Sequence, residues 1–319
     1  MGQYILRRLL IAIPTLLVIS FVIYAILALA PGDPLASFAA NPAVPPSVRA
    51  NIRHQMGLDR PWYVRYFKWV TALVQGQWGY SFSSKVPVTL LIRQRLPQTL
   101  WVVGIAYCIA ILIAVPIGIL SSVKQYSLFD QLATTFAFVG FSVPTFFTGL
   151  LFILLFSIKL HWFPSIYSST LQVHDLSSFV LQLKQIALPV AVLALNGSAD
   201  ITRFMRSSML DNLPQDSVRT ARAKGLSDRM VIMRHVLRNS LIPVVTLIAL
   251  GIPTIFAGAI ITEQIFRVNG LGQLLISSIQ SSDTPVVMAL TFIFAILVVV
   301  FNLVADVLYG FLDPRIRYS

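Results

Sequence analysis

The chain has 319 residues, of which 56% are hydrophobic and only 11% are charged, and its mean hydropathy is +0.79. Soluble domains carry roughly 25% charged residues, so this composition excludes an ordinary soluble protein and predicts several membrane spans. The formal net charge of +12 does not indicate nucleic-acid binding, because the basic residues are dispersed between apolar stretches, where they set orientation in the membrane.

The first predicted span runs from Leu9 to Ala30, directly after Arg7 and Arg8. Its length of about 22 residues is sufficient to cross roughly 30 Å of hydrocarbon as a helix. The sequence at 28–30, Ala-Leu-Ala, also fits the cleavage site of a signal peptide, but the apolar core of a signal peptide is shorter, roughly 7–15 residues. Pro31 directly after the cut also disfavours cleavage. We therefore expect a retained span with its N-terminus in the cytoplasm.

Residues 31–97 are predicted to form an extracytoplasmic region, which together with the first span makes a first unit over residues 1–97. This region is rich in basic residues, an apparent breach of the positive-inside rule, but long loops translocate largely regardless of charge. The aromatic run from Trp62 to Trp69 predicts a helix at the membrane interface. Its aromatic side chains either form an ordinary interfacial belt or have a role in substrate handling.

A second unit, residues 98–319, is predicted to hold five more spans: Thr99–Leu120, Leu132–Ile158, Ile186–Phe204, Leu241–Ile261 and Val286–Leu308. The segments 160–185 and 262–283 are expected to lie outside. Residues 203–238 contain eight basic and three acidic residues, whereas the last external loop contains only Arg267. This asymmetry predicts that both termini are cytoplasmic. The fold class is therefore an all-α membrane protein with six transmembrane helices.

The most charged stretch of the second unit, residues 211–243, lies between the fourth and fifth spans. Pro214 suits the first turn of a helix, and Gly225 suits a helix end that needs positive φ. Ser227 can cap a second helix, in which Met230, Met233 and Leu237 recur at helical spacing as an apolar stripe. The stretch is either a solvated basic loop or a docking element for a cytoplasmic subunit.

The order of residues here, VRTARAKGLSDRMVIMRHVLRNSLIP, resembles the cytoplasmic EAA loop of ATP-binding-cassette importer permeases. Aligned on Gly225, the residues Ala221, Gly225 and Leu237 match the general pattern, whereas Arg219, Thr220 and Arg238 depart from it. The variant TARAKGLS…LRNSLIP is similar to the form in the first-type permease subunit of dipeptide, oligopeptide and nickel importers. Further motifs resemble that branch in the same order: APGDP (30–34), MGLDRPWYVRYFKWV (56–70), GQWGYS (76–81), LPQTL (96–100), EQIFRVNGLG (263–272) and DPRIR (313–317).

The resemblance implies the type I importer permease (MetI-like) fold, in the cell inner (plasma) membrane. It implies a transport subunit rather than an enzyme, importing dipeptides or oligopeptides, with nickel or another small solute as the alternative. The implied partners are a second similar permease, two ATPase subunits and an extracytoplasmic binding protein, which part of residues 31–97 could contact. ATP and Mg would be bound by the partner subunits and no cofactor by this chain, in which no G-x-x-x-x-G-K-[ST] motif occurs.

Residues 206–238 are assigned as the coupling loop, and a conformational change of the ATPase would pass through its two helices to the spans. Gly225 would set the angle between these helices. The residues expected to couple to the ATPase are Arg219, Thr220, Ala221, Arg222, Lys224, Gly225, Met230, Met233 and Leu237.

Four residues are candidates for the substrate path: Asn196, Ser198, Glu263 and Asn302. Glu263 either touches the substrate or marks the membrane interface. Asp200 and Arg203 are three residues apart and can pair on one helix face, and Asp306 is a candidate because ionisable groups within spans are costly. The four histidines show no metal-ligand spacing, so neither a metal site nor a catalytic residue is predicted.

An ion-gradient-driven secondary transporter is the competing class. That class is expected to show paired charges deep in the membrane and interrupted helices repeated in both halves, and the sequence has neither pattern. An intramembrane enzyme would need a polar catalytic set within the spans, which is also missing.

Overall fold

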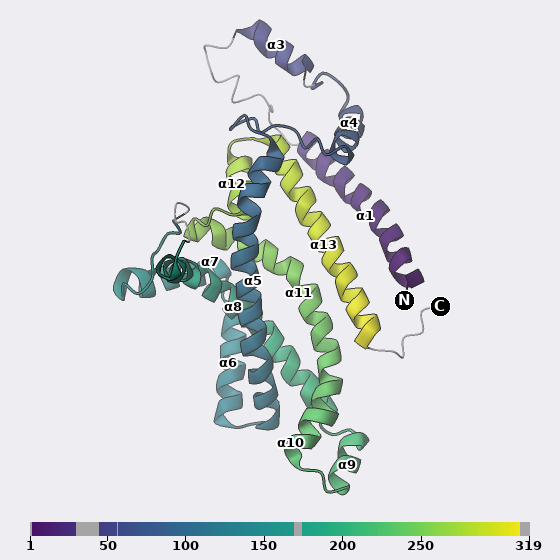
Figure 1. The fold of residues 1–319 in the computed structure, drawn as a ribbon, viewed down its shortest axis with the longest axis vertical. Helices are drawn as coiled ribbons and strands as arrows, with labels where there is room; N and C mark the ends of the chain where they lie inside the picture. The colour runs from purple at the N-terminus through teal and green to yellow at the C-terminus, as the bar shows by residue number, and fades with distance from the viewer. Residues whose placement is uncertain (1, 30–44, 56, 169–173, 313–319) are drawn as a thin grey trace.

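The computed structural model describes residues 2–29, 45–55, 57–168 and 174–312, and the regular secondary structure of these residues is helical apart from one isolated β-bridge between Tyr80 and Pro87. The motifs at 30–34 and 313–317 lie outside the described residues. The helices (Figure 1) are α1 Gly2–Leu29, α3 Pro46–Gln55, α4 Trp62–Val74, α5 Val88–Val123, α6 Leu128–Ser142, α7 Thr145–Phe152, η1 Ile153–Lys159, α8 Leu176–Asn212, α9 Asp216–Ala223, α10 Asp228–Val231, η2 Ile232–Val236, α11 Leu237–Phe266, α12 Leu271–Gln280 and α13 Thr284–Leu312.

Five helical stretches of the described chain are long and apolar enough to cross a membrane, and a bent pair of helices makes a sixth when it is counted as one span. The five are Leu6–Leu29, Val88–Val123, Leu176–Asn212, Asp228–Pro253 and Thr284–Leu308. This agrees with the predicted all-α class and its six spans.

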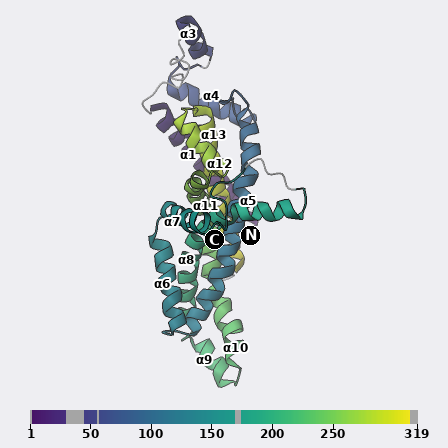
Figure 2. The same cartoon turned by 90° about the vertical axis from the view of Figure 1, so that its left-hand side faces the viewer.

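The third predicted span, 132–158, corresponds to a bent pair of helices. It is divided into α6 and the α7–η1 helix, whose axes differ by 106°. Val143 is extended with ψ of 122°, and Pro144 caps α7 with ψ of 140°. A proline disfavours helical backbone in the residue before it, so the helix stops and restarts in a new direction. Figure 2 shows α7 lying across the axis of α6.

Two segments that were predicted to be external loops contain helix. α8 begins at Leu176, inside the segment 160–185, because Asp175 and Ser178 form a capping box at its start. α12, Leu271–Gln280, lies within the segment 262–283, and its Leu271 and Leu275 are buried. The predicted fourth span, 186–204, lies within α8, so only the start of α8 was missed, because it carries polar residues; α12 was missed because it is short.

The core of the bundle is built on α5 and α8, which pack along each other, with α11 against α8. Gly118 of α5 allows the closest approach, because a Cβ there would lie 2.7 Å from the Cβ of Met205 on α8. Apolar side chains from α5, α8 and α11 form two large buried clusters along the bundle.

α1 lies beside α13 (Figure 1), and an ion pair of 3.0 Å joins Arg8 to Asp306. α4 packs against α1 through a buried cluster of aromatic side chains. At the same contact, the hydroxyl oxygens of Ser20 and Tyr66 are 3.0 Å apart. Figure 1 places α3, α4 and α12 towards one end of the molecule and α9 and α10 at the other. The start of α1 and the end of α13 point towards the α9–α10 end.

Candidate functional site

The predicted coupling loop consists of α9, a tight turn and the α10–η2 helix, which continues directly into α11. Gly225 in the turn has φ of +77°, which confirms the positive φ expected from the sequence. The turn is closed by hydrogen bonds from Gly225 N to Arg222 O at 2.9 Å and from Leu226 N to Ala221 O at 3.3 Å. The predicted coupling loop, 206–238, also includes the last turns of α8, which continues to Asn212, and the first residues of α11, which begins at Leu237. We call residues 213–236 the α9–α10 segment.

One local prediction for this segment is wrong, and a second is confirmed only in position. Pro214 lies before the helix rather than in its first turn, since α9 begins at Asp216 with Gln215 as N-cap. Ser227 occupies the N-cap of α10, but its side chain makes no capping hydrogen bond. Instead, an ion pair of 3.4 Å between Arg222 and Asp228 bridges the turn from one helix to the other.

One side of the α9–α10 segment is built into the core of the bundle. Val218 and Ala221 of α9, together with Val231 and Val236, are buried. They belong to the same cluster as Met205 and Met209 of α8 and as Ala114 of α5. Since well-packed interiors resist deformation, a displacement of this segment is transmitted to α5 and α8.

The other side of the segment is exposed and basic. Met230 and Met233 keep 47% and 56% of their surface accessible, whereas Leu237 is 9% exposed. The predicted stripe therefore does not lie on one face, because the π-helical turn η2 shifts the register between Met233 and Leu237. Of the nine predicted coupling residues, the structure buries Ala221 and Leu237 and exposes the other seven: Arg219, Thr220, Arg222, Lys224, Gly225, Met230 and Met233.

A buried ion pair next to this segment was missed by the sequence reasoning. Arg206 of α8 donates two hydrogen bonds to the carboxylate of Asp130 on α6, at 2.7 and 2.8 Å. The hydroxyl of Ser121 at the end of α5 and the amide of Tyr126 also donate to Asp130, which is 3% exposed. The pair ties the α5–α6 turn to α8 less than two turns before α8 ends. The sequence did contain one signal for this pair, since Asp130 is the only acidic residue in the short loop between the second and third predicted spans.

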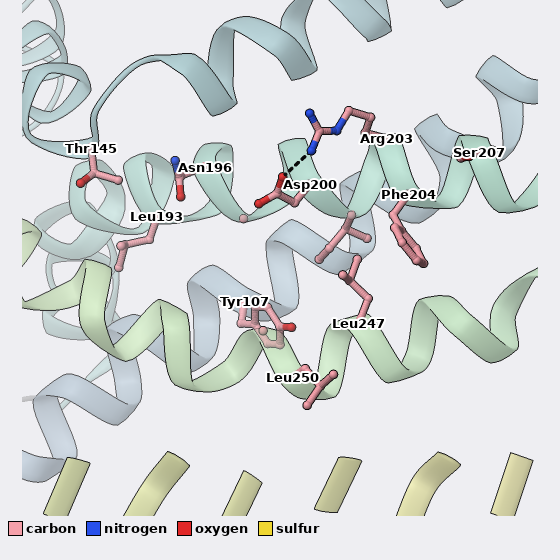
Figure 3. Close-up of a pocket in the computed structure, with 13 residues that line it drawn as sticks. Tyr107, Thr145, Leu193, Asn196, Asp200, Arg203, Phe204, Ser207, Leu247 and Leu250 are labelled. Atoms are coloured by element: carbon pink, nitrogen blue, oxygen red, sulfur yellow. Dashed lines mark hydrogen bonds and ion pairs between the residues drawn. The ribbon is translucent and has the colours of Figure 1, made fainter. Parts of the chain in front are cut away.

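A cavity of about 750 Å³ lies between α8 and α11, with Tyr107 of α5 and Thr145 of α7 in its wall (Figure 3). The predicted pairing of Asp200 and Arg203 is confirmed, with an N–O distance of 3.3 Å. Both side chains line the cavity. The guanidinium of Arg203 also lies over the ring of Phe141, 4.8 Å from its centre. The pair thus forms a polar part of a cavity wall that is otherwise largely apolar.

The four substrate-path candidates are not brought together. Asn196 lines the cavity, and its amide donates to the Gly140 carbonyl at 3.4 Å. Ser198 and Asn302 are not among the lining residues. The hydroxyl of Ser198 bonds back to Leu195 O at 2.9 Å, and Asn302 is exposed on α13.

Glu263 is 1% exposed and joins three elements at the α12 end of the molecule. Its carboxylate accepts hydrogen bonds from the hydroxyl of Thr99 on α5 at 2.6 Å and from the amides of Gly272 and Gln273 at 2.7 and 3.1 Å. A carboxylate at a helix N-terminus is favoured by the helix dipole. In this structure Glu263 therefore fastens α11 to α5 and to the first turn of α12, away from the cavity.

Within the described residues, no three His, Cys, Asp or Glu side chains gather closely enough to hold a metal ion. Two other features of the described residues are candidates for a functional site. These are a basic segment with one buried and one exposed side, and a cavity next to the helices that bury it.

Two family models together match nearly the whole chain. Residues 114–318 match the "Binding-protein-dependent transport system inner membrane component" family, and residues 1–103 match "Binding-prot-dependent transport system membrane comp, N-term". The first of these models alone covers more than half of the chain.

Full-length relatives are similar in sequence. The chain is 42% identical to the oligopeptide transport system permease protein AppB of Bacillus subtilis and 38% identical to the glutathione transport system permease protein GsiC of Salmonella paratyphi A. Both similarities cover 100% of this chain and 100% of the relative.

The fold is similar to that of the MetNI methionine ABC transporter in inward-facing conformations. The TM-score is 0.58 at 16% identity, over 70% of this chain and 97% of that chain. The chain therefore belongs to the inner-membrane components of binding-protein-dependent transport systems and is a permease subunit of an ATP-binding-cassette importer, not itself an ATPase.

Proposed function

We propose that this permease imports dipeptides or oligopeptides and that the exposed side of the α9–α10 segment receives the motion of the ATPase. The cargo assignment is supported by relatives of equal length whose names specify oligopeptides and glutathione, at 42% and 38% identity.

The observation that carries the coupling role is the two-sided burial of the α9–α10 segment. Val218 and Val231 are completely or almost completely buried, whereas Met230 and Met233 are about half exposed. Exposed methionines are adaptable contact residues, and the exposed basic side chains beside them suit an acidic partner surface. Force applied to the exposed side reaches α5, α8 and α11 through the buried side.

Alternating access follows from where those helices meet. α8 and α11 form the wall of the 750 Å³ cavity and also bury the α9–α10 segment. A tilt of the segment changes the separation of α8 and α11, and so opens or closes the cavity. Asn196 and the Asp200–Arg203 pair would offer hydrogen bonds to a peptide that passes through it.

The proposed orientation places both termini and the α9–α10 segment in the cytoplasm of a cell with an inner membrane. It is supported by the direction of α1 and α13, whose terminal ends point towards that segment. The complete importer would contain a second, similar permease, two ATPase subunits that bind ATP and Mg, and a binding protein that meets residues 31–97. The division into units 1–97 and 98–319 is supported by the two family matches, which separate between residues 103 and 114.

Cysteine cross-linking tests the coupling role. In a Cys108→Ala background, which removes the only cysteine, Met230→Cys is expected to cross-link to the ATPase subunit in the assembled complex. Tyr80→Cys is the matched control, because Tyr80 is exposed in the residue 77–85 region on the α4 side of the molecule. Cross-linking from position 80 but not from 230 would overturn the assignment.

The cargo is tested separately, in proteoliposomes that contain the full complex and the binding protein. Uptake of a labelled dipeptide or short oligopeptide is expected to depend on ATP and to be unaffected by excess nickel. Uptake of nickel without peptide uptake would refute the peptide assignment and leave the coupling role intact.

A further inference from the structure

A polar stripe runs along one side of α8. Its members are spaced four, three and four residues apart, which places them on one helix face, and all of them line the 750 Å³ cavity: Asn196, Asp200, Arg203 and Ser207. Figure 3 shows them along the same side of α8, whereas Phe204 points towards α11. At 1.5 Å for each residue the stripe is about 16 Å long, the length of an extended peptide of about five residues.

The exposure of the charged pair within this stripe indicates that it faces water. The side chains of Asp200 and Arg203 are 51% and 43% exposed, although both lie in the helical stretch 176–212, which is long and apolar enough to cross a membrane. Ionisable side chains in such helices face a bundle interior or a water-filled cavity, because contact with hydrocarbon is costly. The pair therefore marks this cavity as a path that a hydrophilic solute can follow.

Arg203 is positioned to bind a carboxylate. Its guanidinium lies over the rings of Phe138 and Phe141 of α6, 5.7 and 4.8 Å from their centres. The rings contact the face of the guanidinium, and its N–H groups lie in the plane, where a carboxylate can accept two parallel hydrogen bonds. The bond to Asp200 uses Nη2 and a single oxygen at 3.3 Å, whereas a strong charged hydrogen bond measures about 2.7–2.9 Å.

The contact between Asp200 and Arg203 is weak enough to be exchanged for contacts with a ligand. Exposed ion pairs contribute little to stability, so separating these side chains costs little when each charge gains a new partner. The Cβ atoms of residues three apart on a helix are about 5–6 Å apart, and the charged ends of an extended dipeptide are about 7 Å apart. The two side chains can therefore reach both ends of a dipeptide at once.

We propose that Asp200 binds the α-ammonium group and Arg203 the α-carboxylate of the transported peptide, so that the permease itself selects short peptides with free termini. Asn196, one turn before Asp200, lies where the backbone of a longer peptide would pass. The inference rests on the proposed import of peptides and adds to it a recognition site in the membrane chain.

The test measures binding without the binding protein, whose own selectivity would otherwise dominate. A dipeptide with a diazirine in its second side chain photo-labels this chain in the permease–ATPase complex in nanodiscs. The competitors, up to millimolar concentration, are an unlabelled dipeptide with free termini, its C-terminal amide and its N-acetyl form. In the wild type each blocked form is expected to compete roughly ten-fold more weakly, the effect of losing one charged hydrogen bond.

The variants connect each terminus to one residue. In Arg203→Gln the free dipeptide and its amide are expected to compete equally, while the penalty for N-acetylation remains; Asp200→Asn should show the converse. Arg203→Lys keeps the charge and should keep most of the preference for a free carboxylate. Lys184→Gln and Asp211→Asn, exposed on α8 outside the cavity, are the matched controls and should retain both preferences.

Two results would overturn this inference and leave peptide import intact. One is an equal loss of competition by all three peptides in Arg203→Gln and Asp200→Asn, which would assign the pair a structural role. The other is a wild-type complex that takes up peptide in proteoliposomes but is not labelled by the dipeptide at millimolar concentration. A complete wild-type complex that imports no peptide would refute both the inference and the proposed function.

Discussion

The geometry of the α9–α10 segment depends on Gly225. Its φ is +77°, and no atom lies within 4 Å of where a Cβ would be, so backbone conformation alone limits substitution. We expect Gly225→Val to lower peptide uptake at least ten-fold while the protein still reaches the membrane, because a β-branched residue resists positive φ. Uptake is measured in cells that carry all partner subunits. Gly225→Asn, which tolerates this conformation, is the control and keeps most activity; normal uptake by the valine variant would count against coupling.

Glu263 accepts three hydrogen bonds in a buried position at the α12 end. Glu263→Ala leaves the Thr99 hydroxyl and the Gly272 and Gln273 amides without their acceptor. We expect a loss of stability on the order of 3 kcal/mol, measured as a lower thermal unfolding midpoint in detergent. Asn302→Ala, at an exposed position, is expected to leave the midpoint unchanged. An unfolding midpoint for Glu263→Ala similar to that of the wild type would show that these hydrogen bonds contribute little to stability.

The residues also show where sequence reasoning succeeds and where it stops. The positive φ of Gly225 and the Asp200–Arg203 pair were predictable, because both depend on neighbours within a few positions. The partner of Glu263 was not, since Thr99 is 164 positions away. Leu237 was assigned to the wrong face because the π-helical turn before it changes the helical period, which a fixed spacing cannot anticipate.

At the scale of the elements, the ion pair between Asp130 and Arg206 holds α6 and the α5–α6 turn to α8. Removing one partner leaves a buried charge unpaired, so Arg206→Ala is expected to destabilise the protein by about 3 kcal/mol. Because α8 then moves without α6, peptide uptake should fall further than ATP hydrolysis does. Both rates are measured in proteoliposomes.

The neutral pair Asp130→Asn/Arg206→Gln is the matched control for that variant. It retains hydrogen-bonding capacity without an isolated charge, so its stability loss should be smaller than the sum of the two single substitutions. Strict additivity in this double-mutant cycle would mean that the two side chains act independently.

The elements themselves were predictable in number and class but less so in shape. Long apolar stretches identify the spans, and Pro144 identifies where the third is interrupted. The 106° angle between the two halves depends on packing against α8 and α11, which no local pattern encodes. α12 is amphipathic and only ten residues long, so hydropathy did not separate it from a loop.

At the scale of the whole molecule, Asp283 joins residues 81–83 to the start of α13. Burial raises the pKa of Asp283, but the hydrogen bonds from Ser81, Phe82 and Ser83 outweigh it, so its pKa is lowered overall. A lowered folded-state pKa gives stability that is present above the ordinary aspartate range and lost as the pH falls through the folded value. The unfolding midpoint of the wild type should therefore exceed that of Asp283→Asn at neutral pH, and the difference should shrink below about pH 4. A difference that does not change with pH would contradict this linkage.

The pairing of α1 with α13 has a consequence for biosynthesis. α1, residues 2–29, is synthesised well before α13, residues 284–312, which is its main partner among the described helices. During synthesis α1 must therefore remain without this partner until α13 has been made. A nascent chain released before α13 emerges would hold an orphan helix, and quality-control proteases could recognise such chains by that helix alone.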